Sequence, residues 1–418
     1  MARIQPFRAL RFDPRSIPDL SRVIAPPYDV IDAEEQTRLH AASPHNIVHL
    51  ILGKQSAADT EADNRYTRAR TAYDAWRREG VLTRDGQPAL YVTEHRYTVD
   101  GVTRARIGFT GLLEFEEPIE RVVFRHEATL SGPKADRTKL LDAVPANLSP
   151  VFCLYPDTGG AVAALLQDLV RRTAPAVSAS YRGDTVRLWV VTDAEVIRRV
   201  AEGLAKTPVL IADGHHRFEV AFSRRDRHKA VMSYFVSFQD PGLAVRPIHR
   251  ILRGVSPAQA KALEALCVLE PARDLGALLQ WLQEGHGAGR FGYCGAGKLF
   301  KTSLRPERLT QWLAAPSVPA PIAGFDVAIL HGLILPAAGM AGAEIRYSAQ
   351  AGEVVQAAGE GGADTAAWLL RGIPTPEVYR VASQGVILPP KSTYFYPKVL
   401  SGLTVNPLDG EPVRGLAG

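Results

Sequence analysis

An acid, a glycine, two histidines and an arginine follow one another in residues 213–217, inside the stretch IADGHHRFEV. The segment before them, TPVLIA, is largely apolar and predicts a strand, and the segment after them predicts a helix over 215–227. A helix N-terminus has unsatisfied amide hydrogens and a partial positive charge, so it attracts phosphate or carboxylate groups. The sequence therefore predicts an anion-binding turn between this strand and this helix.

Each residue of the turn suits a distinct chemical role. Gly214 allows the backbone to approach a ligand closely, while His215 and Arg217 add donors, with Arg217 offering a two-pronged grip on phosphate oxygens. A carboxylate beside a bound phosphate is repulsive unless a metal ion or a proton intervenes. Asp213 is therefore expected to be a Mg²⁺ ligand or a general base, and His216 is a further candidate acid or base.

A simpler interpretation of the same residues is structural. Asp213 suits the N-cap of a helix, and the histidines suit a polar surface. Five polar or special residues directly after an apolar strand favour the functional interpretation over this one.

A second group of candidate residues lies in RHEATLSGPKADR, residues 125–137. His126 or Glu127 could supply a second acid or base, and Lys134 and Arg137 could bind anions. The alternative is a solvated loop whose local salt bridges contribute little to stability.

Three further segments extend the list of candidates. Glu219, two residues after Arg217, could assist catalysis, and Arg250 in RPIHR could extend a positive pocket. Lys391 and Ser392 in PPKSTYFYPK could clamp a phosphate or a nucleobase. Their alternative is an edge strand that proline and lysine protect from pairing with other chains.

The elements around these residues mix helices and strands. Alternating runs on either side of Asp100 and Gly101 predict a β-hairpin, because Asp-Gly provides the positive φ of a tight turn. Strand, polar turn, helix and strand over 207–238 form the β-α-β pattern in which ligands bind at the carboxyl end of the strand. The fold class is therefore α/β or α+β, with mixed sheets and helices.

Breaks and composition predict further elements. Gly132 and Pro133 are expected to interrupt the chain before a helix near 136–144. The stretch AGEGGADTAAWLLRG, residues 358–372, is expected to turn into a helix. Length alone favours two or three packed units in 418 residues. The predicted units are an N-terminal α+β unit at 1–125, a core with the ADGHHR motif at 126–254, and a C-terminal α/β unit at 255–418 whose tail could return to the site.

The bulk composition excludes several classes of protein. Hydrophobic residues make up 46% and charged residues 22%, as in ordinary globular chains. The net charge of +5 is scattered along the chain, which disfavours nucleic acid as a partner. Three widely spaced cysteines and the lack of a signal peptide or membrane span predict a cytoplasmic protein without disulfides or membrane contact.

Two resemblances add to this interpretation. ADGHHR, with its strand and helix, resembles the phosphate-binding motif of the ParB/sulfiredoxin-like superfamily and is similar to that of the ADP-dependent free-serine kinases. APPYDVI, SPHNIVHL, RHEATLSGPKADR, ANLSPVFCLY, ADGHHRFE, PIHR and PPKSTYFYPK resemble the successive motifs of a large bacterial family with a domain of unknown function, over residues 20–403. The first resemblance implies a ParB/sulfiredoxin-like core and a role for Asp213 in activating a substrate hydroxyl.

Together these observations predict a phosphotransferase that uses Mg²⁺ and ATP or ADP to phosphorylate a small hydroxylated metabolite, such as a hydroxy amino acid. The alternatives are a nucleotide-gated regulatory module of ParB-like type and a phosphatase that uses the same pocket. The expected partner is a phosphorylated small molecule or a nucleotide, and a homodimer stays open as the assembly.

Overall fold

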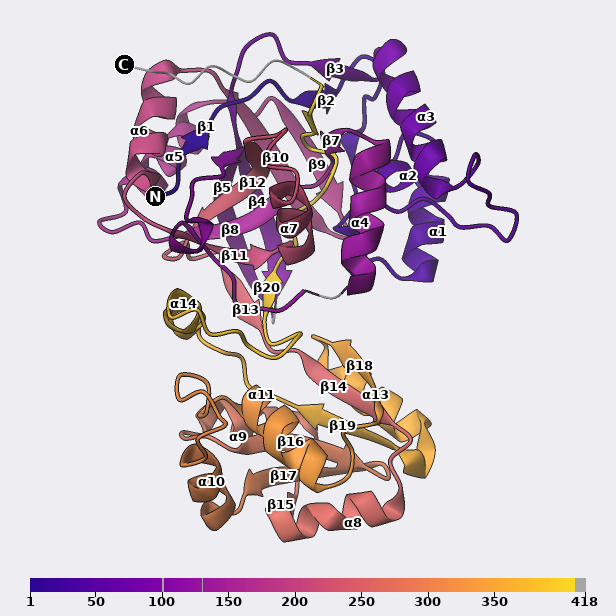
Figure 1. The fold of residues 1–418 in the computed structure, drawn as a ribbon, viewed down its shortest axis with the longest axis vertical. Helices are drawn as coiled ribbons and strands as arrows, with labels where there is room; N and C mark the ends of the chain where they lie inside the picture. Colours follow the sequence, from indigo (N-terminus) through magenta and orange to yellow (C-terminus); the bar gives the residue numbers. More distant parts are fainter. Residues whose placement is uncertain (100, 130, 410–418) are drawn as a thin grey trace. The chain divides into compact units, whose positions relative to one another are not determined.

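The computed structural model describes residues 1–99, 101–129 and 131–409. The chain divides into two compact units. Unit 1 comprises residues 1–124, 129–244 and the segment from 397 onward, and unit 2 comprises 125–128 and 245–396. Each unit is a sheet covered by helices, so the predicted mixed α/β class is confirmed (Figure 1).

Unit 1 is organised around a nine-stranded mixed sheet with the order β6-β11-β8-β12-β5-β4-β10-β9, and β1 also pairs with β5. Its strands are β1 (Ile4–Gln5), β4 (Leu90–Val99), β5 (Val102–Glu114), β6 (Val123–Phe124), β8 (Val151–Tyr155), β9 (Val177–Tyr181), β10 (Asp184–Val191), β11 (Val209–Asp213) and β12 (Ala230–Ser237). Strand β11 runs antiparallel to β8, and β8 runs parallel to β12.

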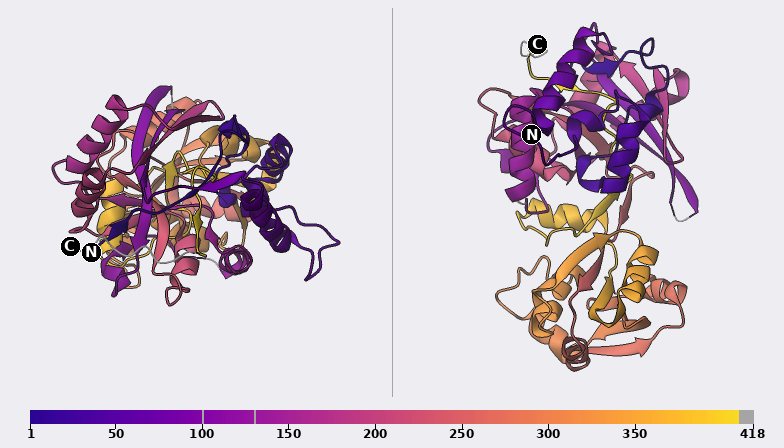
Figure 2. Two further views of the ribbon diagram at one scale, coloured as in Figure 1. Left: turned by 90° about the horizontal axis from the view of Figure 1, so that it is seen from above. Right: turned by 90° about the vertical axis from the view of Figure 1, so that its right-hand side faces the viewer.

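Helices cover both faces of this sheet (Figures 1 and 2). One face packs through apolar side chains such as Cys153, Ile211 and Phe235 against α5 (Ala161–Arg172), α6 (Ala194–Leu204) and α7 (His215–Phe222). The helices α1 (Ala33–Ala42), α2 (Val48–Ile51), α3 (Arg65–Arg78) and α4 (Ser131–Ala143) form a second core with Ala179 and Val186 on the other side. Two short pairs, β2 (Leu10–Phe12) with β3 (Leu82–Arg84) and β7 (Ala146–Asn147) with β21 (Asn406–Pro407), complete the unit.

Unit 2 is built on a six-stranded antiparallel sheet with the order β15-β17-β16-β19-β14-β18. The strands are β14 (His249–Arg253), β15 (Cys267–Pro271), β16 (Arg290–Gly295), β17 (Lys298–Leu304), β18 (Glu344–Ser348) and β19 (Thr365–Leu369). Helices α9 (Leu275–Glu284) and α13 (Ala351–Glu360) pack against it. Further elements over residues 244–396 are β13 (Ala244–Arg246), α8 (Pro257–Leu266), α10 (Pro306–Leu313), α11 (Asp326–Ile329), a π-helical turn at 330–334, α12 (Leu335–Ala337), a 3-10 turn at 362–364, α14 (Thr375–Ser383) and β20 (Tyr394–Tyr396).

The structure has two units where the sequence predicts three. The physical reason is that β4 and β5, from the first predicted unit, share a single sheet with β8, β10, β11 and β12 from the second. Since strands of one sheet bury a common core, the first two predicted units form one body. None of the helices in the described ranges combines the length and the apolarity needed to cross a membrane.

The structure confirms one of the predicted local elements and corrects two others. The hairpin of β4 and β5 is confirmed, although Asp100 of its turn lies outside the described residues. The predicted break at Gly132 and Pro133 is wrong, because both residues lie in the first turn of α4, where proline is tolerated. The helix predicted near the end of 358–372 is also wrong, because residues 365–369 form the buried strand β19 between β14 and β16.

The predicted β-α-β unit around ADGHHR differs from the structure in its pairing. Strands β11 and β12 flank α7 in sequence, but β8 lies between them in the sheet and they run in opposite directions. The helix is also shorter than predicted and ends at Phe222. The turn between β11 and α7 nevertheless stands at the carboxyl end of a buried strand, as the sequence predicts.

Candidate functional site

The candidate site of unit 1 begins at the turn between β11 and α7. Strand β11 is buried throughout and ends at Asp213, and Gly214 then adopts φ +92 as the residue before the helix. A Cβ atom at Gly214 would lie 2.9 Å from Cζ of Arg217. Glycine is therefore required both for the left-handed backbone and for the space that the Arg217 guanidinium occupies.

Asp213 lies between two cationic side chains. Its Oδ2 accepts a hydrogen bond of 2.6 Å from Nη2 of Arg217, and its Oδ1 accepts one from Nζ of Lys398. Asp213 is 8% exposed. Burial alone would raise the pKa of Asp213, but the charges of Lys398 and Arg217 outweigh it and hold that pKa below its ordinary value.

Arg217 is directed back over the turn rather than into solvent. Its Nη1 donates to the carbonyl oxygen of Pro150, which directly precedes β8. Its Nε is buried and has no hydrogen-bond partner in the described structure. The Nε donor of this guanidinium therefore stays open, while Nη1 and Nη2 hold the turn against the sheet.

Lys398 reaches Asp213 because the C-terminal segment returns to unit 1. Ser401, three residues later, forms an isolated β-bridge with Ala25 of the APPYDVI motif. Its hydroxyl also lies 2.6 Å from that of Ser149. These contacts fix the backbone next to Lys398 and place its ammonium group against Asp213.

Helix α4 adds a second set of polar groups, because it packs against α7. Oε2 of Glu219 accepts from Oγ1 of Thr129 at 2.8 Å and from Nζ of Lys134 at 3.1 Å. The segment 125–137 thus contributes Lys134 to the site, and Glu219 is an ion-paired acid rather than an isolated base.

Arg137, on the same helix, stacks on Tyr28 of the 3-10 turn Tyr28–Val30. Its Cζ lies 3.8 Å from the centre of the Tyr28 ring, and its Nη1 donates to the carbonyl oxygen of Ile51. Burial raises the pKa of Tyr28 to about 12, with the charges of Arg137 and Arg217 opposing the rise. The motif APPYDVI therefore lies at the same site as Lys134 and Arg137. The two prolines of the motif do not by themselves predict this position.

The remaining predicted residues form a separate cluster in unit 2. Oε1 of Glu127 accepts from the backbone N–H groups of Ser392 and Thr393 at 3.1 and 3.4 Å. Nε2 of His126 lies 2.8 Å from Oγ1 of Thr393. Successive amides around one carboxylate are typical of an anion-binding turn, and here Glu127 itself is the anion.

Arg250 is the buried centre of this unit 2 cluster. It is 1% exposed, and its Nη2 donates to the carbonyl oxygen of Lys391 at 3.0 Å. Its Nε donates to Nε2 of His331, which lies on the π-helical turn, at 3.1 Å. Burial lowers the pKa of Arg250 to about 10. Arg250 thus holds the loop that carries Lys391 and Ser392, and does not line an open positive pocket.

Two histidines beside Arg250 are expected to make the stability of unit 2 depend on pH. Burial, and after it the charge of Arg250, lowers the pKa of His249 and of His331 to about 4. Each ring accepts a hydrogen bond through an unprotonated nitrogen, His249 from the backbone N–H of Leu370 and His331 from Arg250. Because unfolded histidine binds its proton near pH 6.5, the stabilisation is complete above that pH and is lost as the pH falls toward 4.

We expect the free energy of unfolding of unit 2 to fall by about 1.4 kcal/mol per pH unit for each histidine in this range. Urea unfolding between pH 7 and pH 4.5, monitored by hydrogen exchange of the amides of β14 and β19, measures how the free energy of unfolding of unit 2 changes with pH. His331→Asn should remove about half of it. A slope that persists in the double variant with His249→Asn would overturn this assignment.

The structure therefore divides the predicted site residues between the two units. Unit 1 brings together Asp213, Gly214, His215, His216, Arg217 and Glu219 on β11 and α7 with Lys134 and Arg137 on α4. Unit 2 contains His126, Glu127, Arg250, Lys391 and Ser392. Lys398 and Tyr28 also belong to the site of unit 1, and both lie in motifs that the sequence had singled out.

The predicted magnesium ligand does not fit the geometry of Asp213. Both of its oxygens accept from cations, and a divalent ion there would face two positive side chains. Within the described ranges, no group of three or more His, Cys, Asp or Glu side chains could hold a metal ion.

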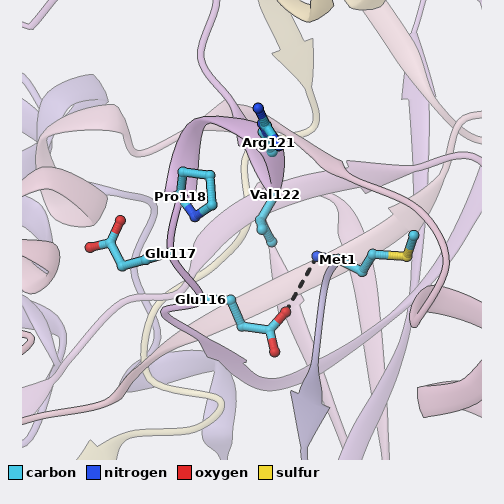
Figure 3. A pocket seen from close by; sticks show the side chains of 6 residues that line it. All are labelled: Met1, Glu116, Glu117, Pro118, Arg121 and Val122. Atoms are coloured by element: carbon cyan, nitrogen blue, oxygen red, sulfur yellow. Dashed lines mark hydrogen bonds and ion pairs between the residues drawn. The ribbon is translucent and has the colours of Figure 1, made fainter.

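A separate hollow of about 560 Å³ opens on unit 1, lined by Met1, Glu116, Glu117, Pro118, Arg121 and Val122 (Figure 3). The amino group of Met1 lies 3.3 Å from Oε2 of Glu116 across it. Val122 accepts from the backbone N–H of Val209, at the start of β11, whereas Asp213 ends that strand. The hollow therefore lies at the other end of β11 and is not part of the candidate site.

Fold and site together define a mixed α/β protein with a charged turn at the carboxyl end of a sheet strand. The chain belongs to the family described as protein of unknown function DUF1015, whose model matches residues 4–327. The predicted membership of a family with a domain of unknown function is therefore confirmed. A comparison with curated proteins finds no match.

Among solved structures, the chain is similar to SbnI with a C-terminal truncation from Staphylococcus aureus, at a TM-score of 0.40 and 10% identity over 72% of this chain and 90% of that one. It is also similar to a conserved hypothetical protein from Pyrococcus furiosus, at a TM-score of 0.36 and 15% identity over 69% of this chain and 94% of that one. A free serine kinase in complex with AMP matches at a TM-score of 0.35 and 14% identity, over 66% of this chain and 84% of that one. The ParB/sulfiredoxin-like core stays a prediction from the ADGHHR motif.

Proposed function

We propose that unit 1 binds the phosphate group of a nucleotide and transfers it to a small hydroxylated metabolite, such as a hydroxy amino acid. The observation that carries this proposal is the arrangement of Asp213 between Arg217 and Lys398 at the start of α7. Phosphoryl transfer chiefly requires positioning and neutralisation of charge, and this arrangement supplies both.

Anion binding follows from the charges around the turn. Arg217, Lys398 and Lys134 are cations, and the first amides of α7 add their partial positive charge. The Nε of Arg217 is buried and has no hydrogen-bond partner. It could donate a hydrogen bond to a phosphate oxygen. Lys134 is about half exposed, so it is the cation that an arriving ligand meets in solvent.

Asp213 gains its chemical role when the phosphate displaces it from one of its cations. In the present arrangement both of its oxygens are engaged, and its lowered pKa makes it a weak base. A phosphate that takes over Lys398 or Arg217 leaves one oxygen free and raises the pKa toward its ordinary value. The freed oxygen can then accept the proton of a substrate hydroxyl.

The second candidate function is a nucleotide-gated binding module without turnover. It is favoured by the placement of the acids: Glu219 is held by Lys134 and Thr129, and Glu127 belongs to unit 2. Asp213 is likewise engaged by two cations, so the turn between β11 and α7 offers cations for an anion while the carboxylates of Asp213 and Glu219 are both occupied. A phosphatase would use the same groups with water in place of the metabolite.

Incubation of the full chain with ATP or ADP, Mg²⁺ salts and a panel of hydroxy amino acids separates these functions. Phosphorylated product, detected by ³¹P NMR and lost in Arg217→Lys, supports the transferase. Arg224→Lys is the matched control, because Arg224 pairs with Asp142 on the exposed surface. Nucleotide binding without product supports the module, and release of inorganic phosphate supports the phosphatase. Absence of both binding and turnover would overturn the proposal.

A further inference from the structure

A small cavity in unit 1 is lined by charged and polar side chains that the candidate site does not use. It lies between the sheet and the returning C-terminal segment, and the space open to the centre of a water-sized sphere is about 10 Å³. Its lining residues are Thr93, His95, Arg106, Val186, Tyr234, Val399, Leu400 and Leu403. A cavity of this size holds one water molecule or one particle of similar size.

Arg106, on β5, brings a buried positive charge to this cavity. It is 1% exposed, and its Nη1 donates to the carbonyl oxygen of Pro397 at 2.6 Å. Its Nε is buried without a hydrogen-bond partner. In the part of the chain that the structure describes, no carboxylate lies within ion-pair distance of this guanidinium.

Only part of the charge of Arg106 is offset by its surroundings. The rings of Phe152 and Tyr234 lie 4.9 and 5.4 Å from its Cζ and attract it through their π faces. Asp240 interacts with it at longer range, but the oxygens of Asp240 accept from the backbone N–H groups of Ile107 and Gly242. A buried cation in this state is expensive unless a negative charge joins it.

Tyr234, on β12, adds a second open donor. Its side chain is 2% exposed and its hydroxyl has no hydrogen-bond partner. Gly108 lies opposite, and a Cβ atom there would approach the hydroxyl to 2.6 Å. Because Gly108 has no side chain, it leaves room for the Tyr234 hydroxyl but supplies no side-chain hydrogen-bond partner for it.

The other polar residues of the lining do not provide a negative charge. His95 lies 3.0 Å from Asp184 through its Nε2, and burial lowers its pKa, so the imidazole is neutral at neutral pH. Thr93 is uncharged. The occupant must therefore accept hydrogen bonds and be a single small particle, such as a water molecule or a monatomic ion.

We propose that this cavity is a binding site for a small monovalent anion of halide type, held by Arg106 and Tyr234. Phosphate and sulfate are too large for the space, and a water molecule would leave the guanidinium charge without compensation. Because Arg106 also holds Pro397, the anion stabilises the C-terminal segment directly before Lys398. This site is independent of the phosphotransferase proposal.

Bromide titration at constant ionic strength, with gluconate as the replacement anion, tests the site in the full chain. Above the dissociation constant, the apparent unfolding constant of the wild-type protein should fall about tenfold for each tenfold rise in bromide. Arg106→Met should abolish this dependence. Tyr234→Phe should weaken bromide binding by about tenfold or more, because a hydrogen bond to a charged group is lost.

Arg187→Met is the matched control, because Arg187 lies on β10 next to Val186 but its side chain points to the other face of the sheet. It should keep the bromide dependence of the wild-type protein. If Arg106→Met fails to fold, Tyr234→Phe decides the question. Crystals soaked in bromide should show an anomalous peak between Arg106 and Tyr234. Equal stability in bromide and gluconate, or an ordered water in place of the peak, would overturn the proposal.

Discussion

Replacing Asp213 by asparagine is expected to lower the free energy of unfolding of the protein by about 3–5 kcal/mol. The neutral amide leaves the largely covered side chains of Arg217 and Lys398, which are 10% and 11% exposed, without the carboxylate that both of them contact. Losing one partner of a buried ion pair is far more harmful than losing an exposed one, because water cannot solvate the remaining charge. Urea unfolding of the full chain measures this change.

The same substitution should increase the affinity of the protein for phosphate. Two cations that have lost their shared carboxylate attract an anion to the first turn of α7 more strongly than two cations that keep it. Added phosphate should therefore raise the melting temperature of Asp213→Asn more than that of the wild-type protein. A loss of stability that phosphate does not restore would show that the turn holds the fold together without binding anions.

Asp142→Asn is the control for the Asp213 substitution. Its carboxylate pairs with Arg224 at 2.8 Å, and the two side chains are 54% and 36% exposed. Water solvates both groups when the pair is broken, so the expected loss is under about 1 kcal/mol. Similar losses for the two variants would contradict the assignment of Asp213 as a buried doubly paired acid.

The turn around Asp213 could be predicted from sequence because its determinants are local. An apolar strand, a glycine and a polar helix start occur within one short segment, and Gly214 does adopt the left-handed backbone. The same reasoning located the hairpin of β4 and β5. In each case the residues that decide the structure are neighbours along the chain.

The partners of the turn could not be predicted, because they come from distant segments. Lys398 is 185 residues from Asp213, and its place depends on the bridge between Ala25 and Ser401. No local spacing in the sequence encodes that bridge. The position of Lys398 is therefore a property of the tertiary fold, even though its motif attracted attention.

The pairing of strands has the same origin. The sequence order β11, α7, β12 favours a parallel unit, but β8 pairs with both strands and separates them. Similarly, residues 365–369 have the composition of a helix, yet all of them are buried between two strands of the unit 2 sheet. Long-range pairing overrides local propensity in such central strands.

Replacing Gly214 by alanine is expected to destabilise the protein by about 2–5 kcal/mol. The left-handed backbone at φ +92 accounts for about 1–2 kcal/mol of this loss. The new Cβ would also lie 2.9 Å from Cζ of Arg217, and relieving that overlap adds about 1–3 kcal/mol. Urea unfolding measures the total.

The second contribution depends on whether Arg217 can move. A free guanidinium would swing aside at little cost, but this one donates to Asp213 and to the carbonyl oxygen of Pro150, and its displacement breaks both hydrogen bonds. Gly80→Ala isolates the backbone term, since Gly80 has φ +70 and a Cβ there meets no atom within 4 Å. Equal losses in the two variants would mean that Arg217 is not held over the turn. A larger loss at Gly214, together with weaker protection of the protein by phosphate, would tie the conformation of this glycine to anion binding, because the displaced guanidinium could no longer face the first turn of α7.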